Sequence, residues 1–192
     1  MTPRPLQRVA ARAELRRGST MLHPECPIEQ ALHSPDPIVH AQLMQEIWRG
    51  HSFIEEGVLL VADPKCLRVL ARTERALRAP VQALRERHGP TLVVEAPCVR
   101  YAHGAPVLEP FMSVLLSGPP RHLPQLQADL ATRRATITRT DTRADPFVVE
   151  AEAPLGHLLG YGDWLTGRFG DTVDLGMWLS RYRPITDGPQ AA

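Results

Sequence analysis

Arginine is the residue type of this sequence with the most evident capacity for binding chemistry. Lys65 is the only lysine, so arginine supplies nearly all of the positive charge. Arg133 and Arg134 end a predicted helix, and Arg139 and Arg143 follow on the next predicted strand and turn. Because planar guanidinium groups bind phosphate well, this spacing predicts an RNA contact at one edge of a domain. Two alternatives stay open: arginines at a helix C-terminus favour the helix dipole and water, and a GC-rich genome also enriches arginine.

Two carboxylates could perform acid–base chemistry. Glu150 and Glu152 fall on one face of a predicted strand, where nearby like charges would separate their pKa values. A solvated sheet face explains the same spacing without chemistry. The 192 residues contain no His-Glu-x-x-His, Cys-x-x-Cys or Gly-x-Ser-x-Gly motif, and no Gly-x-x-x-x-Gly-Lys-Ser/Thr loop for a nucleotide. We therefore expect no enzyme activity, no metal, no cofactor and no bound nucleotide.

Cysteine and tryptophan fit structural roles. Cys26, Cys66 and Cys98 are odd in number and far apart, which predicts buried thiols rather than a disulfide framework. Trp164 and Trp178 could stack on a partner, but large aromatic residues near apolar stripes favour the core. The paired aromatic signature of RNA-recognition sheets is missing, so we do not expect single-stranded RNA binding.

Composition restricts the class of protein. A chain of 192 residues that is 43% hydrophobic can form one large or two small domains. The net charge of +1 excludes a strongly basic protein that coats nucleic acid, so any RNA contact must be a local patch. No apolar run reaches the length of a membrane span, and the charged N-terminus is unlike a signal peptide. These features predict a cytoplasmic protein with no membrane partner.

Residues 1–24 carry five arginines and few large apolar side chains, so we expect a basic and flexible N-terminal tail. A basic helix face is the alternative for this segment. A start of translation at Met21 would remove most of the tail.

Residues 25–101 show the pattern of a small α+β module. Asp36-Pro37 predicts a helix start, and Gly89-Pro90 predicts the end of a second helix. Asp63-Pro64-Lys65 predicts the turn of a hairpin. The expected elements are a strand at 28–32, a helix from 37, strands at 58–61 and 67–71, a helix at 74–88 and a strand at 91–96.

The same order repeats over residues 107–185, after a linker at 102–106. The expected elements are a strand at 107–117, a helix around 123–130, a hairpin of 135–142 with 147–153, a helix over 155–165 and a strand around 172–180. Residues 186–192 are expected to be a flexible tail. The predicted fold class is α+β: two tandem ferredoxin-like (βαββαβ) modules, each an antiparallel sheet with helices on one face.

Motifs in the second module resemble the fifth domain of the translation elongation factor G family. They appear in the family order: Leu108-Glu109-Pro110-Phe111-Met112, Asp129 to Ala135, Ala153-Pro154-Leu155 with Gly160-Tyr161, Leu165-Thr166-Gly167-Arg168, and Leu179-Ser180-Arg181-Tyr182. The first module resembles the third domain through its element order, Gly50-His51-Ser52-Phe53 and Pro97 to Tyr101. The family's glycine-rich segment is replaced by Ala71 to Leu77, and the loop between Tyr161 and Gly170 is shorter.

The resemblance implies a particular kind of protein. The G domain, the second domain and the fourth domain of the family have no counterpart here, which predicts neither GTPase nor translocase activity. The fifth domain of the family lies near ribosomal RNA and the stalk base. This implies ribosome or RNA contacts at five candidate residues: Arg133, Arg134, Arg139, Arg143 and Arg168.

We therefore expect a non-enzymatic, ribosome- or translation-associated protein derived from elongation factor G, whose partner is the ribosome near the factor-binding site or a translation factor. One alternative is a tandem ferredoxin-like module that binds a protein or senses a small molecule, because a fold does not determine a function. Another is a decayed gene fragment.

Overall fold

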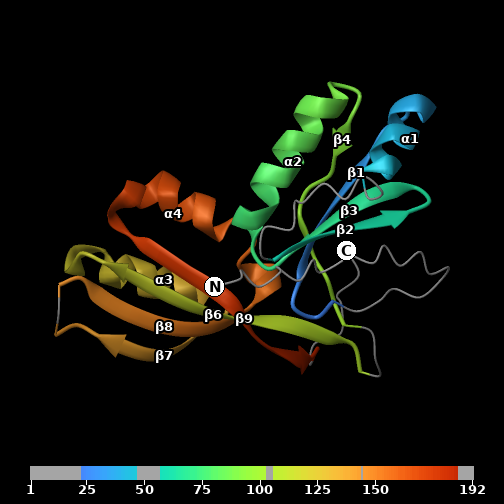
Figure 1. The fold of residues 1–192 in the computed structure, drawn as a ribbon. Helices are drawn as coiled ribbons and strands as arrows, with labels where there is room; N and C mark the ends of the chain where they lie inside the picture. The colour runs from blue at the N-terminus through green and yellow to red at the C-terminus, as the bar shows by residue number, and fades with distance from the viewer. Residues whose placement is uncertain (1–22, 47–56, 103–105, 144, 186–192) are drawn as a thin grey trace, which may run out of the picture.

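A computed structural model describes residues 23–46, 57–102, 106–143 and 145–185 (Figure 1). Residues 1–22 of the predicted N-terminal tail (1–24) and the whole predicted C-terminal tail, 186–192, lie outside the described residues. The segment Gly50 to Phe53 and the linker residues 103–105 lie outside them as well.

The first module contains one antiparallel sheet and two helices. Its elements are β1 (Ile28–His33), α1 (Pro37–Gln45), β2 (Val58–Asp63), β3 (Cys66–Ala71), α2 (Glu74–His88), β4 (Val93–Val94) and β5 (Cys98–Val99). The strand order is β2-β3-β1-β4, and β5 also pairs with β1.

The second module repeats this plan. Its elements are β6 (Leu108–Gly118), the short 3₁₀ helix η1 (Pro120–His122), α3 (Leu123–Thr132), β7 (Thr136–Asp141), β8 (Phe147–Pro154), η2 (Leu155–His157), α4 (Tyr161–Phe169), η3 (Gly170–Thr172) and β9 (Asp174–Pro184). The strand order β7-β8-β6-β9 places the strands as in the first sheet, and every pairing is antiparallel. The predicted pair of ferredoxin-like modules is confirmed.

Local sequence signals explain the helix ends of the first module. The Asp36 side chain accepts a hydrogen bond of 2.8 Å from the Ile38 amide, and Pro37 occupies the first turn of α1. At the other end of the module, α2 stops at Gly89, whose φ of 75° is left-handed and suits glycine.

Two predicted elements differ from the structure. The strand expected at 91–96 is reduced to Val93–Val94, and the chain rejoins β1 beyond Pro97, which has no amide hydrogen to donate to a ladder. The helix expected over 155–165 is divided into η2 and α4. Gly160 lies between them with a φ of 75°, so the backbone turns there instead of continuing the helix.

The core of the second module lies on one face of its sheet. Phe147, Val149, Ala151 and Ala153 alternate along β8, and each is at most 2% exposed. They share a hydrophobic cluster with Leu126, Leu130 and Leu165 of α3 and α4. The opposite face carries Glu150 and Glu152, as the alternation predicts. We call this uncovered side the open face of the second sheet.

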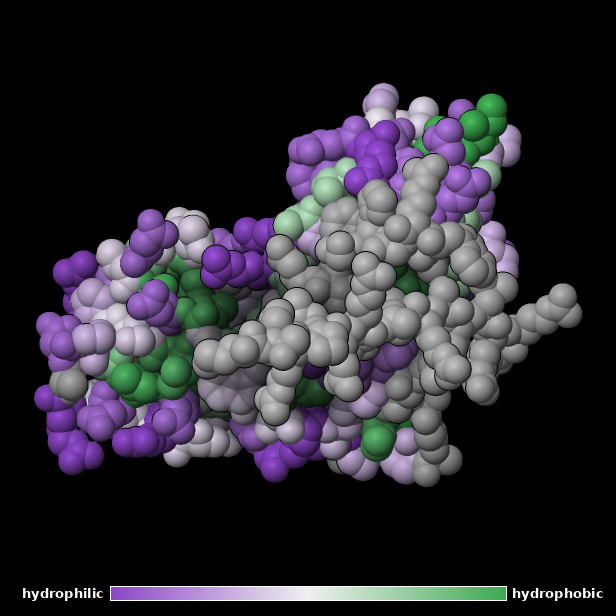
Figure 2. All heavy atoms as spheres, in the orientation of Figure 1, coloured by the Kyte–Doolittle hydropathy of each residue, from purple (hydrophilic) through white to green (hydrophobic). Residues whose placement is uncertain are grey.

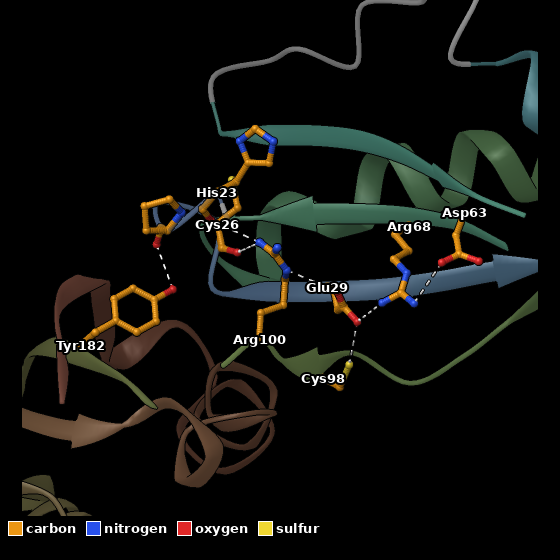
Figure 3. A network of polar contacts seen from close by, with 9 residues as sticks. His23, Cys26, Glu29, Asp63, Arg68, Cys98, Arg100 and Tyr182 are labelled. Atoms are coloured by element: carbon orange, nitrogen blue, oxygen red, sulfur yellow. Dashed lines mark hydrogen bonds and ion pairs between the residues drawn. The ribbon is translucent and has the colours of Figure 1, made fainter. Parts of the chain in front are cut away.

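Polar contacts join the two modules, and β5 of the first also packs near η2 of the second. The Glu74 carboxylate of α2 accepts a hydrogen bond of 2.9 Å from the Gly160 amide, and Arg78 forms an ion pair with Asp163 of α4. Elsewhere the Tyr182 hydroxyl donates to the Pro24 carbonyl oxygen over 3.0 Å (Figure 3). Burial raises the pKa of Glu74. Neither helix in these contacts, nor any other described helix, is long and apolar enough to cross a membrane.

Candidate nucleic-acid interface

The five predicted contact arginines do not gather in a single patch. Arg133 and Arg134 precede β7, whereas Arg143 follows it, and a strand of six residues separates its ends by about 20 Å. Arg168 ends α4, which leads into β9 at the same end of the sheet as Arg143. Two ends of the second module must therefore be considered separately (Figure 1).

Arg133 is held by other parts of the module. Its guanidinium donates to Asp129 Oδ2 over 2.9 Å and to the His157 carbonyl oxygen over 3.0 Å. It also lies over the Tyr161 ring, 4.4 Å from the centroid, and its side chain is only 20% exposed. These contacts join α3 to η2 and α4, so we assign Arg133 a structural role. Little of its guanidinium group remains accessible to a phosphate.

Arg139 and Arg143 share an acidic neighbour. Arg139 lies 3.4 Å from Glu150 and 3.7 Å from Asp141, while Arg143 lies 3.4 Å from Asp141. The Arg143 side chain is 89% exposed, and exposed pairs of this kind are weak. A phosphate could compete with Asp141 for Arg143 at small cost.

Arg134 and Arg168 are both at the surface but differ in setting. Arg134 has a φ of 56° and turns the chain out of α3 toward β7. Arg168 has a neutral partner, because Nε and Nη2 donate to the Gln125 amide oxygen over 2.9 and 3.0 Å. Its positive charge is thus not cancelled by that contact.

Sequence reasoning missed Arg121, which the structure brings close to Arg168. Arg121 belongs to η1, and its neighbour His122 packs against Phe169 with ring centroids 4.9 Å apart. Because Gly118 pairs with Phe147, the β7–β8 turn lies at this end as well. We call this part of the molecule, with Arg121, Arg143 and Arg168, the turn end. Only the Gly118-Pro119-Pro120 turn beside Arg121 could have indicated it in the sequence.

The visible surface of the second module carries both hydrophilic and hydrophobic residues (Figure 2). Figure 2 shows hydrophilic residues along the outer border of the second module, around a patch of hydrophobic ones. A hollow of about 430 Å³ lies instead between the modules, beside Glu74, Arg78 and Asp163. Its lining mixes these charged groups with the apolar side chains of Leu77, Val81 and Val94.

The acid–base alternative at Glu150 and Glu152 has no support in the geometry. The pKa of Glu152 is lowered, first by a hydrogen bond from Ser180 and then by Arg181 and Arg183. A general acid would need its pKa raised instead. Among the described residues, no group of three or more His, Cys, Asp or Glu side chains could hold a metal ion.

The predictions for tryptophan and cysteine hold only in part. Trp164 packs between Tyr161 and Phe169 at centroid distances of 5.8 and 5.9 Å, whereas Trp178 is 52% exposed on the open face. Cys26 is buried, and burial raises its pKa to about 11, but Cys98 is exposed. Trp178 and Cys98 correct the prediction, because both lie on sheet faces that no helix of the described residues covers.

A polar network occupies the corresponding face of the first sheet (Figure 3). Glu29 accepts a hydrogen bond of 2.9 Å from Arg68 and lies 3.2 Å from Arg100 Nε. Arg100 also donates to the Cys26 carbonyl oxygen over 2.8 Å, and its side chain is 10% exposed. This network satisfies its charges internally and leaves no evident site for a ligand.

Comparison with known proteins identifies relatives of this chain. Residues 106–192 match the family model described as the elongation factor G C-terminus. Ribosome-releasing factor 2, mitochondrial, of Danio rerio is 27% identical over 129 residues, 64% of this chain and 17% of that protein. Its Mus musculus counterpart is 34% identical over 86 residues, 45% of this chain and 11% of the relative. Elongation factor G of Jannaschia sp. (strain CCS1) is 29% identical over 82 residues, 43% of this chain and 12% of that protein.

A solved structure of a protein from Thermus thermophilus has a TM-score of 0.59 at 14% identity, covering 85% of this chain and 41% of that one. This likeness concerns the fold alone. The chain spans between 11% and 17% of the length of these curated relatives. The predicted resemblance to elongation factor G is confirmed, and it is carried by residues 106–192.

Proposed function

We propose that this chain is a non-enzymatic, translation-associated protein that binds the ribosome near the factor-binding site through its second module. The observation that carries the proposal is the match of residues 106–192 to the C-terminus of elongation factor G. Two relatives are named for releasing ribosomes, which supports a ribosomal partner. The proposed protein acts in the cytoplasm, and these 192 residues supply no GTPase or translocase activity.

We further propose that residues 25–101 correspond to the third domain of the family and residues 107–185 to the fifth. The equal strand order of the two sheets supports this division. The 129-residue match to the Danio rerio factor is longer than the segment 106–192, so it extends into the first module.

Two arginines of the turn end support an RNA contact there, and they lie among the carboxylates Asp141, Asp145, Asp171 and Asp174. Arg168 is bound to a neutral amide, and Arg143 is almost fully exposed beside a single carboxylate. Neither guanidinium would have to leave a strong partner to reach a phosphate. Arg134 at the opposite end is a separate candidate, and Arg133 supports the module from within.

The test is co-sedimentation of the full chain with ribosomes at low salt, with purified elongation factor G as competitor. We expect wild-type protein to pellet with ribosomes and elongation factor G to displace it. The double variant Arg143→Glu, Arg168→Glu should lose at least about tenfold in affinity, since each reversal replaces an attraction to phosphate by a repulsion. Arg134→Glu tests the other end of the module in the same assay.

A matched control reverses two exposed arginines of the first module, Arg75→Glu and Arg85→Glu, with the same change in net charge. This control should bind ribosomes nearly as well as the wild type. Absence of pelleting at low salt would overturn the proposal. Equal losses of ribosome affinity in the control and in the turn-end variant would mean that the effect arises from net charge and not from a contact at the turn end.

A further inference from the structure

The open face of the second sheet carries a flat aromatic surface that the proposed ribosome contact does not use. Ser113 of β6 pairs with Trp178 on one side and with Glu152 on the other, so these side chains share the open face. Trp178 is 52% exposed, which is unusual for the largest side chain of a sheet. The residues around Trp178 explain why its indole is exposed.

Gly176 provides the space in which the indole lies. Gly176 precedes Trp178 by two residues on the same face and pairs with Leu115. A Cβ on Gly176 would lie 3.4 Å from Cζ3 of Trp178 and 3.5 Å from the Leu115 Cβ. The indole therefore leans along β9 onto the bare backbone of Gly176. Glycine weakens a strand interior and often marks a place of close approach, which here leaves one side of the ring open to a partner.

The charges around this surface are acidic. The open face carries the carboxylates Glu109, Asp141, Glu150, Glu152 and Asp174 and the arginines Arg139, Arg181 and Arg183. Carboxylates still outnumber arginines when Arg143 of the neighbouring turn is included.

The arginines of this face are already engaged. Arg181 and Arg183 both pair with Glu152, and Arg183 also lies over the Phe111 ring at 4.4 Å. Asp174 is exposed four residues before Trp178 on the same face, and no described residue forms an ion pair with it. Over the whole open face the five carboxylates exceed the three arginines, and this net negative charge opposes the phosphates of RNA.

We propose that this face binds an extended protein segment rich in arginine or lysine, with one cationic side chain over the Trp178 ring and beside the Asp174 carboxylate. A cation over an indole face is attracted by the ring quadrupole, and a nearby carboxylate adds Coulomb attraction. The open face and the turn end are then two separate binding surfaces, which meet at Asp174. The first takes a basic protein segment, and the second takes nucleic acid.

The experiment measures fluorescence anisotropy of a labelled peptide with alternating arginine and serine residues as the full chain is added. A peptide with glutamine in place of arginine and a decauridine RNA are titrated in parallel. The wild type should bind the arginine peptide best. Trp178→Ala should weaken that binding about three- to tenfold, and Asp174→Asn about twofold.

Two controls separate this site from general effects. Tyr101→Ala removes another exposed aromatic side chain, 45% exposed and outside the open face, and should leave peptide affinity unchanged. Arg143→Glu with Arg168→Glu should not weaken it, because added negative charge favours a cationic peptide, so failure of this proposal is distinct from failure of ribosome binding. Circular dichroism melting verifies that each variant is folded.

Several results would overturn the proposal. One is equal peptide affinity in wild type and Trp178→Ala. Another is preference for decauridine over the arginine peptide, which would make the face an RNA surface. A dimer in sedimentation equilibrium that Trp178→Ala dissolves would make the occupant a second copy of the chain. Absence of peptide binding up to about 1 mM would exclude the site at any useful affinity.

Discussion

The two sheets have the same strand order, yet the open face of the second sheet differs from the corresponding face of the first. Side chains on the face of the first sheet are buried or paired, whereas those on the second are more exposed. On the first, Glu29 joins Arg68 and Arg100, and Leu70 of β3 is 2% exposed. On the second, Trp178 is 52% exposed, and Asp174 is exposed four residues before it on the same face. The repeated fold therefore determines where a face lies, whereas its side chains decide whether the face is internal or available to a partner.

Leu70 and Trp178 give the largest contrast between the faces. Leu70→Ala should lower the free energy of unfolding by about 3 kcal/mol, because it removes a buried side chain and leaves a cavity. Trp178→Ala should cost less than about 1 kcal/mol, since half of the indole is already in water. Urea unfolding followed by circular dichroism measures both. Equal costs would show that the second face is as internal as the first.

The next largest difference in stability is expected between the ion pairs of the two faces. Glu29→Ala leaves Arg68 and the largely buried Arg100 without their shared carboxylate, at a cost of about 2 kcal/mol. Glu150→Ala is the matched change on the second face, where the single partner Arg139 is 62% exposed, and should cost less than about 0.5 kcal/mol. The same urea titration compares them. A larger loss of unfolding free energy for Glu150→Ala than for Glu29→Ala would contradict the inference that the Glu29 network stabilises the first module.

Glu152 gives the second face a dependence on pH. Its lowered pKa means that the ionised form stabilises the folded state above the unfolded pKa, which is about 4.3, and that this stability is lost as pH falls through the folded pKa. At pH 7 the wild type should exceed Glu152→Gln by about 1 kcal/mol. The difference should shrink as the pH falls and the Glu152 carboxyl of the folded protein becomes protonated. Melting curves from pH 7 to pH 3 test this, and a constant difference would show that the carboxylate charge is not responsible.

The smallest effect is expected at the contact between the modules. Arg78 and Asp163 are 63% and 70% exposed, so Arg78→Ala should change stability by less than about 0.5 kcal/mol. Such a result would leave Glu74 and Tyr182 as the stronger ties between the modules. Differential scanning calorimetry would detect the contrary result, a separation of the single transition into two.

The fold could be predicted because its signals are local. Asp36-Pro37 and Gly89 define helix ends by their own backbone preferences, and the alternation along β8 follows from the two-residue period of a strand. The break at Gly160 escaped prediction, since the apolar spacing of Leu155, Leu158 and Leu165 also fits one continuous helix.

The candidate site was harder to predict because it depends on long-range geometry. Arg133 and Arg143 are close in sequence, but β7 carries them to opposite ends of the module. Arg121 and Arg168 are far apart in sequence, yet the packing of His122 on Phe169 brings their segments together. The exposure of Trp178 depends on Gly176 and on a sheet face that none of the helices in the described part of the chain covers, which spacing alone does not reveal.

The most direct test of the account is the salt dependence of ribosome affinity for the wild type and for Arg143→Glu, Arg168→Glu. Each phosphate contact contributes about −0.7 to −0.9 to the slope of log affinity against log salt concentration. We predict a steep wild-type slope that becomes shallower by about two contacts in the double variant. An affinity independent of salt, or identical slopes for the two proteins, would contradict ribosomal RNA binding through the turn end.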